Sequence, residues 1–532
     1  MKKLGFILMA CALIMGTAQC KKNDETNKPE NDGESVFITL NVGGGTRAEV
    51  VPEDDFAPVY YAEGDMIHVV SDGKYIGTLT YNGSNFTGDI TNPTEGQPLH
   101  FYFLGNVTPN ESLVVGETST CSVVINDQTT SHPVISYAPS TQNYSVGTTN
   151  YTATLLNKCA LVKFNVTTVS ENATCITGMN NKVTVDFEIN EFAYSQESDG
   201  VITLSAGDGE KWVILLPQDE MNQTEAHSAD GLYTGTCASI PAIAENDYQV
   251  NGITVTISHP MGAINGLFTI NANGDQVYFS KGNLQYIGSA STPYWKFAEH
   301  QWEYIGDYGQ GSTNQNVDRD LFGWGTSGWN CGNTYYRPWD TYASYSSACL
   351  YGPGPINSPN LTGSYANSDW GYYNAISNGG NTSHTWRTLT GGSNGEWKYV
   401  FDTRSTSSGI RYAMAQVNGV NGVILLPDNW SASTYSLSNT NQGNVDYSSN
   451  VISATQWSTM QDAGAVFLPA AGYRDGTSVN RVGSSGYYWS SSSQGSYYAY
   501  SVRFFDRYLY LSPPSSSIRY NGFSVRLVRA CQ

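Results

Sequence analysis

The chain has 532 residues and a formal net charge of −20, because its 46 Asp and Glu outnumber its 26 Lys and Arg. So acidic a chain argues against nucleic-acid binding, which needs a basic surface. The length predicts two to four domains, each large enough to bury a hydrophobic core.

The N-terminal segment has the pattern of an export signal. Two lysines precede an apolar run over residues 5–18, which is too short to span a bilayer, so residues 1–19 are predicted to be a signal peptide. The Thr-Ala-Gln-Cys sequence that ends at Cys20 resembles the lipobox of bacterial lipoproteins, and this resemblance implies that Cys20 is lipidated. A plain secretory signal is the alternative. Residues 20–34 are polar and charged and are predicted to form a disordered tether.

From residue 35 to about 260 the sequence predicts short β-strands separated by turns. Even spacing and the lack of a long helical period favour two antiparallel β-sandwiches, over residues 35–155 and 156–260. The strongest candidate strands are 36–42, 65–70, 75–81, 160–166, 182–189, 212–216 and 253–257.

Four short motifs in this half resemble the fimbrillin family of Bacteroidetes surface pilins and anchored fimbrial proteins. They are Phe37–Leu40, Thr46–Ala48, Gly64–Ile67 and Cys159–Phe164. The resemblance implies a stalk or subunit role, with polymerisation by strand exchange in true pilins. Thr46–Ala48 is either a maturation site of that family or an ordinary exposed loop.

The composition changes near residue 261. Trp212 is the only tryptophan before residue 290, whereas the rest of the chain is rich in Trp, Tyr, Gly and Ser. This shift predicts an unrelated C-terminal domain over residues 261–532.

Within that part, Asn273-Gly274 predicts a hairpin over residues 267–280. Residues 423–427 and 465–469 are predicted to be buried strands. Two short helices are predicted, one from about Gly395 and one with Thr455 as its N-cap.

The tail from Ser484 to Phe523 is rich in Tyr, Ser, Phe and Arg, with Asp506 as its only acid and no Lys, Glu or Met. Tyr and Arg dominate the binding energy of many interfaces, and Ser adapts its hydrogen bonds, so this composition is typical of a binding surface. The alternative is a Tyr- and Ser-rich edge of a β-domain. Arginine can anchor a ligand, and five arginines lie in or just after this stretch: Arg503, Arg507, Arg519, Arg526 and Arg529.

Four further motifs, in order and spacing, are similar to the large paralogous domain family of gut and rumen bacteria. They are Gly422–Asp428, Gly464–Arg474, Gly486–Ser491 and Ser524–Arg529. The resemblance implies an α+β C-type-lectin-like fold. In some members of this family the C-terminal end is the variable region of a diversity-generating retroelement, which mutates adenines through a reverse transcriptase. For this chain, the resemblance implies a variable region of this kind at about residues 484–524.

The family pattern separates framework positions from displayed positions. Framework positions are Gly486, Tyr488, Trp489, Arg503, Gly522, Val525, Arg526 and Leu527. The implied ligand-binding positions are Ser496, Tyr497, Tyr498, Tyr500, Phe505, Asp506, Arg507, Tyr508, Tyr510, Ser515, Ser516, Ser517, Ile518, Tyr520, Asn521 and Phe523. The alternative for Tyr508 and Tyr510 is that they line the core face of a strand.

Catalytic and metal-dependent functions are not expected. The lectin-like fold also hosts a formylglycine-generating oxidase, but its reactive Cys pair has no counterpart here, because no Cys lies between Cys349 and Cys531. No His follows His384, so a hydrolase triad has no base in the tail.

The calcium-binding loop of sugar-binding lectins is absent, and Leu426–Trp430 is expected to end a buried strand. No cofactor or metal is expected, and Cys331 and Cys349 are the most plausible disulfide pair in an exported protein.

The sequence therefore predicts a multidomain protein, with two antiparallel β-sandwiches followed by an α+β C-type-lectin-like domain. Its predicted function is that of a cell-surface adhesin or ligand-binding lipoprotein of the outer membrane, held to the membrane by a lipid anchor. Its expected partner is a protein or glycan on another cell, a phage or the host, and not a nucleic acid. Two alternatives stay open: a structural or tip subunit that contacts other fimbrial subunits, and a lectin that binds glycans without calcium.

Overall fold

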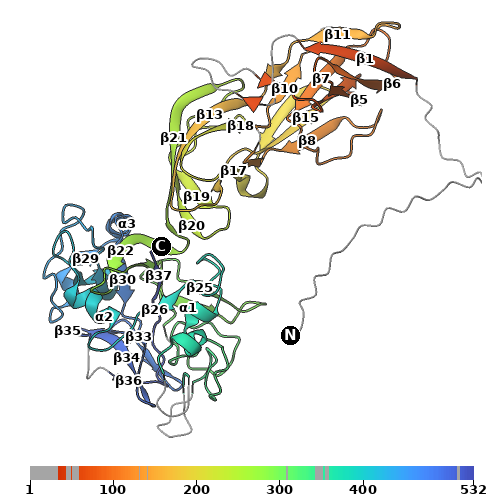
Figure 1. Ribbon diagram of the computed structural model, residues 1–532. Helices are drawn as coiled ribbons and strands as arrows, with labels where there is room; N and C mark the ends of the chain where they lie inside the picture. Colours follow the sequence, from red (N-terminus) through yellow and green to blue (C-terminus); the bar gives the residue numbers. More distant parts are fainter. Residues whose placement is uncertain are drawn as a thin grey trace, which may run out of the picture.

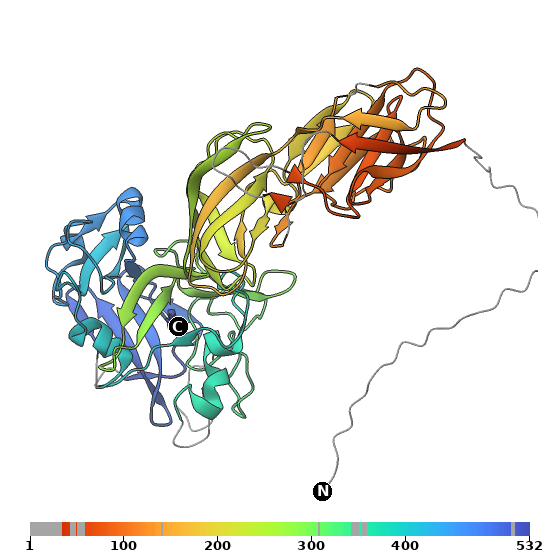
Figure 2. The same ribbon diagram turned by 45° about the horizontal axis from the view of Figure 1, so that its top comes forward.

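The computed structural model describes residues 34–42, 49–50, 59–130, 132–139, 142–306, 309–341, 351–353, 359–511 and 516–531. The chain is multidomain and β-rich, with several separate sheets arranged in an elongated row (Figures 1 and 2). The predicted signal peptide, the lipidation site Cys20 and the Thr46–Ala48 motif lie outside the described residues.

The first β unit is built on an eight-stranded sheet in the order β11-β1-β6-β5-β4-β7-β10-β12. Its neighbouring strands are antiparallel except for β1 and β11, which are parallel. In β1, Ile38 and Leu40 are buried, which confirms the alternation expected for this strand. The strands are β1 Ser35–Val42, β4 Met66–Ser71, β5 Lys74–Tyr81, β6 Phe86–Thr91, β7 Leu99–Leu104, β10 Ile135–Ala138, β11 Asn150–Ala153 and β12 Leu156–Asn157. A separate small pair consists of β2 Glu49–Val50 and β3 Val59–Tyr60.

The second β unit is built on another eight-stranded sheet, in the order β18-β13-β21-β20-β19-β14-β17-β9. Val162, Phe164 and Val255 belong to its core. The strands are β9 Asp127–Gln128, β13 Ala160–Thr168, β14 Thr174–Ile176, β17 Ile202–Leu204, β18 Gly209–Leu215, β19 Thr224–Ser228, β20 Tyr233–Cys237 and β21 Tyr248–Pro260. A short 3-10 helix, η1, spans Ser198–Gly200.

Each β unit contains strands from both sides of the predicted division at residues 155/156. Strands before this division pair with strands after it. A three-stranded sheet joins β8 (Thr120–Val124) to β15 (Lys182–Asp186) and β16 (Glu191–Ser195), and it packs on the core of the first unit. In the other direction, β9 pairs with β17 in the second sheet. Alternation along a strand shows which face is buried, but it does not show which distant strand is its partner.

The C-terminal unit follows directly, because β21 leads into β22 through a two-residue turn (Figure 2). Its first sheet has the order β22-β23-β37-β26, and it contains the predicted hairpin as β22 (Ala263–Thr269) and β23 (Gln276–Ser280). The last strand, β37 (Leu527–Ala530), pairs with β23 and with β26 (Arg387–Thr388), so the two ends of this unit meet.

The remaining sheets of the C-terminal unit carry the predicted motifs. One four-stranded sheet has the order β29-β27-β28-β30, with β27 Tyr412–Val417, β28 Val420–Leu425, β29 Val451–Ile452 and β30 Val466–Pro469. The tail forms another sheet from β33 Ser485–Gln494, β34 Tyr498–Phe505, β35 Tyr508–Tyr510 and β36 Ser516–Ile518. Two short hairpins are β24 Leu284–Ile287 with β25 Tyr294–Phe297, and β31 Tyr473–Asp475 with β32 Ser478–Asn480.

Helices in the C-terminal unit are short. They are α1 Trp370–Tyr373, α2 Glu396–Lys398 and α3 Ala454–Asp462, with 3-10 helices η2 Gly363–Ser368 and η4 Tyr447–Ser449 and a π-helical turn η3 Tyr399–Thr403. The predicted N-cap at Thr455 is wrong by two residues. Ser453 caps α3, because its side chain accepts from the Gln456 backbone N–H while the Gln456 side chain accepts from the Ser453 N–H.

The core of the C-terminal unit is dominated by tryptophan, as the change in composition suggests. Indole rings fill much volume each, and they bury a large apolar area. The completely buried ones are Trp324, Trp370, Trp386, Trp397, Trp430, Trp457 and Trp489.

Candidate ligand-binding surface

The tail sheet determines where the predicted ligand-binding residues point. Strand β34 pairs with β33 along its length, with β35 at its C-terminal end and with β36 at its N-terminal end (Figure 1). Directly opposite residues of antiparallel strands point to the same face of a sheet. The pairs Phe505–Tyr508 and Arg503–Tyr510 therefore share one face.

Three aromatic rings gather on that face. The ring centroids of Phe505 and Tyr508 are 4.9 Å apart, those of Phe505 and Tyr510 are 5.7 Å apart, and the rings of Tyr508 and Tyr510 are parallel at 6.1 Å. Tyr508 is 53% exposed and Tyr510 is 42% exposed. The alternative that these tyrosines line the core face of a strand is therefore wrong. An exposed aromatic cluster of this kind is typical of an interaction surface.

Arg503 and Tyr487 extend the cluster across the sheet. Arg503 lies opposite Tyr487 on β33 and opposite Tyr510 on β35, and both Arg503 and Tyr487 are half-buried. Burial lowers the pKa of Arg503, and the nearby Tyr487 and Tyr510 partly offset that effect. We call Tyr487, Arg503, Phe505, Tyr508 and Tyr510 the aromatic stripe.

The sequence pattern predicts Arg503 as a framework position and does not mark Tyr487 as a ligand-binding residue. Tyr487 lies within the Gly486–Ser491 motif and Arg503 is a framework position of the family pattern, so that pattern placed neither in the ligand-binding set. The alternation of side chains along a strand could have identified them. Every second residue of a strand shares a face, so Arg503 must lie on the same face as Phe505.

The turn between β34 and β35 joins the stripe to a polar pocket. Arg507, in the left-handed region with φ +63°, lies 3.7 Å from Asp446 and 3.9 Å from Asp506, measured between guanidinium nitrogen and carboxylate oxygen. A pocket of about 320 Å³ lies beside this turn. It is lined by Gln416, Asn421, Asp446, Tyr447, Ser448, Ser484 and Asp506.

The other predicted positions lie elsewhere on the sheet. Tyr498 and Tyr500 point to the opposite face of β34, near its other end, where Tyr498 pairs with Ile518. Tyr500 packs directly against the backbone of Gly391. Any side chain at Gly391 would collide with it, because a Cβ placed there would lie 2.5 Å from the Cβ of Tyr500. Half-buried residues of the predicted set also include Ser496, Tyr497, Tyr520 and Asn521. The predicted ligand-binding set thus occupies two faces and not one continuous surface.

Two predicted display positions are buried. Phe523 is 1% exposed and stacks on Trp489 with ring centroids 4.2 Å apart, so it belongs to the core. Ser517 is also buried, and its hydroxyl forms a 2.8 Å hydrogen bond with the hydroxyl of Ser501. Ser515 lies outside the described residues, and Ser516 is described only through its backbone pairing with Tyr500.

Three of the five tail arginines are also buried, so they cannot anchor a ligand. Arg519 lies 4.1 Å from the ring of Trp324 and donates to the carbonyl oxygens of Tyr498, Gly495 and Tyr351. Arg526 is completely buried, and Arg529 donates to the Leu232 carbonyl of the second β unit. These side chains stabilise the fold from within, and only Arg503 and Arg507 remain at the surface of the tail sheet.

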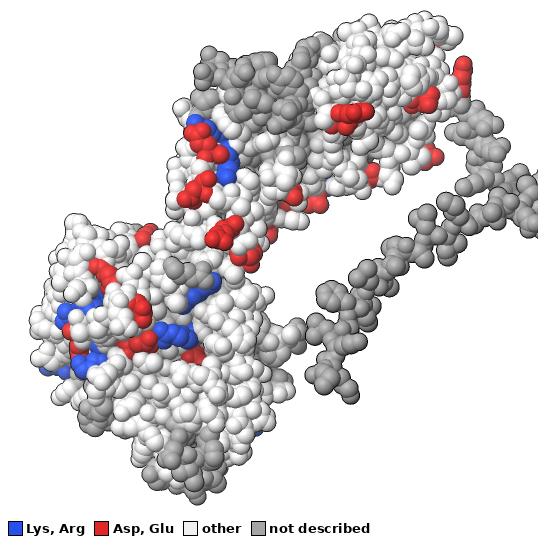
Figure 3. Space-filling view, viewed as in Figure 1, with Lys and Arg blue, Asp and Glu red and all other residues white. Residues whose placement is uncertain are grey.

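Charge is unevenly distributed over the C-terminal unit. Figure 3 shows Lys and Arg interspersed with Asp and Glu on the upper part of this unit, whereas its lower part presents almost no charged side chains on the face in view. A surface poor in charge favours recognition through rings and hydroxyl groups rather than through ion pairs.

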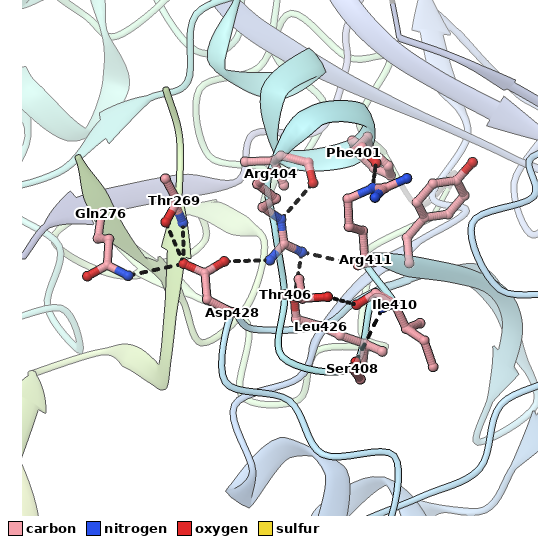
Figure 4. Close-up of polar contacts among 12 residues, drawn as sticks. Thr269, Gln276, Phe401, Arg404, Thr406, Ser408, Ile410, Arg411, Leu426 and Asp428 are labelled. Carbon is pink, nitrogen blue, oxygen red and sulfur yellow. Dashed lines mark hydrogen bonds and ion pairs between the residues drawn. The ribbon is translucent and has the colours of Figure 1, made fainter. Parts of the chain in front are cut away.

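Asp428, in the segment compared with a calcium loop, has a structural role. One oxygen accepts from Arg404 Nη1 at 2.8 Å, and the other accepts from the backbone N–H and hydroxyl of Thr269 and from Gln276 Nε2 (Figure 4). Arg404 is completely buried and also donates to the carbonyl oxygens of Val400, Leu426 and Arg411. The Leu426–Trp430 segment follows β28. The hydrogen bonds of Asp428 and Arg404 connect it to β22, β23 and η3.

The predicted disulfide between Cys331 and Cys349 can be compared with the structure at only one of its two residues. Cys331 is a free thiol that donates to the Gly352 carbonyl, and its predicted disulfide partner Cys349 lies outside the described residues. Within the described ranges, no three His, Cys, Asp or Glu side chains gather as metal ligands. None of the helices in the described part of the chain is long and apolar enough to cross a membrane.

Comparisons with known proteins give one family match and several structural neighbours. Residues 435–528 match a family model described as a domain of unknown function, DUF8237. No curated protein matches the sequence.

Three of the structural neighbours come from Bacteroides species. A "putative cell adhesion protein" from Bacteroides uniformis has 12% identity and a TM-score of 0.28, covering 42% of this chain and 93% of that protein. One of the same description from Bacteroides ovatus has 14% identity and a TM-score of 0.28, covering 43% and 98%. A fimbrial protein from Bacteroides vulgatus has 9% identity and a TM-score of 0.22, covering 42% and 94%.

Proposed function

We propose that this protein is a cell-surface adhesin that binds a protein ligand through the aromatic stripe. In this proposal Cys20 carries the lipid anchor at the outer membrane, the segments 35–155 and 156–260 form a fimbrillin-like stalk of β-sandwiches, and residues 261–532 form a lectin-like head. The observation that carries the proposal is the stacked, exposed pair Tyr508 and Tyr510 beside Arg503 on the tail sheet.

The physical argument concerns the energy that such a surface offers. Tyr and Arg are the residues enriched in binding hot spots, since they bring a large contact area with few rotatable bonds. Here the rings are held by strand pairing and by one another, so little conformational entropy is lost on binding. The polar pocket beside the stripe supplies hydrogen-bonding groups at its rim, as protein interfaces do.

The first test replaces Tyr508 and Tyr510 together with alanine. Labelled surface proteins of bacterial and epithelial cells are captured on the wild-type protein, and the captured protein is purified and titrated against both forms. We expect the double variant to bind at least about thirtyfold more weakly, because hot-spot side chains contribute about 2 kcal/mol or more. Its thermal stability should change little, since both side chains are exposed.

A matched control replaces Tyr294 and Tyr373, two other exposed tyrosines of the C-terminal unit, with alanine. This variant should bind as the wild type does. Equal binding by the Tyr508 and Tyr510 variant would contradict the proposal, and so would an equal loss in the control. A large drop in melting temperature of the Tyr508 and Tyr510 variant would show that these side chains belong to the core.

The proposal includes diversification of the tail, over the variable region at about residues 484–524. It is supported by the tail composition and by the exposure of Asp506, Arg507, Tyr508 and Tyr510. We expect the DNA near the gene to contain a reverse transcriptase gene and a near-copy of the 3′ end that differs only at adenines. Mismatches at the codons of these four residues would support diversification. If no copy is found, the adhesin has a fixed ligand and the diversification proposal fails, while the binding proposal still depends on the tyrosine test.

A further inference from the structure

A second pocket lies in the C-terminal unit, outside the tail sheet. It has a volume of about 520 Å³, within the range usual for small-molecule sites. Its lining comes from the loop that contains residues 335–341, from the turn of the β31–β32 hairpin and from Thr313. The side chains that the argument uses are Tyr335, Arg337, Trp339, Asp340, Thr341 and Thr477.

Aromatic rings form part of the lining and are held in place by other rings. Trp339 is half-buried, and its ring centroid lies 5.9 Å from that of Tyr286. Tyr335 stacks on Tyr351 at 4.9 Å with an angle of 12° between the ring planes. The Arg337 guanidinium carbon also lies 5.7 Å from the centroid of the Trp339 ring, so the orientation of these rings is set before a ligand arrives.

The charges in the pocket are balanced. The Arg337 guanidinium donates to one Asp340 oxygen through Nε at 3.1 Å and through Nη2 at 2.8 Å. The other Asp340 oxygen accepts from the backbone N–H groups of Tyr336 and Arg337. Because each charge already has its partner, the pocket favours neither an anion nor a cation. It still presents polar atoms beside the rings, including the Thr341 and Thr477 hydroxyl groups.

The buried Arg474 side chain links the two segments that form most of the pocket lining, the 335–341 loop and the β31–β32 turn. This side chain is completely buried, and it donates to the carbonyl oxygens of Asp340 and Gly476, each at 3.1 Å. One guanidinium thus links the 335–341 loop to the hairpin turn. A pocket fixed in this way loses little entropy when a ligand binds.

We propose that this pocket binds a neutral sugar ring. A sugar has a C–H face that can lie on the ring of Trp339, whose π face is electron-rich, and hydroxyl groups that both donate and accept hydrogen bonds. The part-exposed Arg337 would donate to these hydroxyls, and the Thr341 and Thr477 hydroxyls can donate or accept. The inference does not depend on the aromatic stripe, because the two sites share no lining residue.

The test uses saturation-transfer NMR of the full-length protein with methyl glycosides of glucose, galactose, mannose and N-acetylglucosamine at millimolar concentration. We expect at least one glycoside to bind. Trp339→Ala should weaken that binding at least about tenfold, since an aromatic anchor is lost. Thr477→Arg should do the same by filling the pocket from an exposed turn position, where folding is not disturbed.

Two controls keep the result specific. Thr477→Ser retains the hydroxyl and should bind as the wild type does, and the Tyr508 and Tyr510 double variant should also bind the sugar normally. If Trp339→Ala fails to fold, Thr477→Arg decides the question alone. Binding of none of the four glycosides, or unchanged binding by Thr477→Arg, would overturn the inference. Loss of sugar binding only in the Tyr508 and Tyr510 variant would also overturn it, because the sugar would then bind at the stripe.

Discussion

Asp428→Asn should lower the free energy of unfolding of the C-terminal unit by about 3–5 kcal/mol. The substitution keeps the shape of the side chain but removes the charge that faces Arg404. The Arg404 guanidinium is completely buried, so its positive charge would be left without a counterion in a medium of low dielectric constant. Burial already lowers the pKa of Arg404 to about 10, which shows how strongly this position disfavours the charge.

The change can be measured by urea unfolding followed through tryptophan fluorescence. All tryptophans except Trp212 follow residue 290, so this signal reports on the C-terminal unit. Asp402→Asn is the matched control, because the Lys398–Asp402 pair is exposed and should contribute less than about 1 kcal/mol. A double-mutant cycle with Arg404→Met should show non-additivity of more than about 1 kcal/mol. Equal small effects of Asp428→Asn and Asp402→Asn would mean that the buried pair does not hold the sheets together.

The second large effect concerns pH, and we expect the first β unit and the C-terminal unit to respond with opposite signs. In the first β unit, burial lowers the pKa of His68 from 6.5 to about 4. The unfolded chain therefore binds a proton before the folded chain does. The stability that His68 contributes is present above pH 6.5 and is lost as the pH falls towards 4, by about 3 kcal/mol.

In the C-terminal unit the buried carboxyl groups act in the other direction. Burial raises the pKa of Asp320 and of Asp369 from 3.8 to about 6. Here the folded state binds the proton more tightly, so the stability from each group is present below pH 3.8 and is lost as the pH rises through 6, by about 3 kcal/mol. The exposed Glu299, whose pKa is lowered by Lys281, opposes this trend only weakly.

Acidification from pH 7 to pH 4 should therefore lower the melting temperature of the first β unit and raise that of the C-terminal unit. Circular dichroism follows the whole β structure, while tryptophan fluorescence follows the C-terminal unit. Asp320→Asn should stabilise the C-terminal unit at pH 7 and flatten its pH dependence, because asparagine resembles the protonated acid. Its amide oxygen can still accept from the Ile305 N–H. Parallel shifts of both transitions would refute the assignment of these groups.

Local patterns predicted many elements of the fold correctly. Alternating apolar residues identified β1 and β13, and short apolar runs identified β28 and β30. These predictions succeed because strand periodicity and burial are local properties of the sequence. The strand expected over residues 182–189 ends earlier, at Asp186, because the Asp186 carboxylate accepts the backbone N–H groups of Glu188 and Ile189 and makes a turn.

The candidate site was predictable in composition but not in geometry. The sequence marked Tyr508 and Tyr510 correctly as exposed, yet it grouped them with Phe523, which is buried. Tyr and Phe are equally able to serve as core and as contact residues, so residue type does not distinguish the two. The same holds for arginine: Arg507 is exposed, whereas Arg519 packs on Trp324 in the interior.

By itself, the sequence determined the β-rich, multidomain character of the chain, the change in composition near residue 261 and the Tyr-rich tail. Only the tertiary structure decided that β8 joins β15, that Arg503 and Tyr487 lie beside Tyr510, and that Arg474 links two loops beneath a pocket. The physical reason is that periodicity and turn chemistry act between near neighbours along the chain. Strand partners, shared faces and pockets depend instead on contacts between residues far apart in sequence, and many arrangements of the same strands satisfy the local pattern equally well.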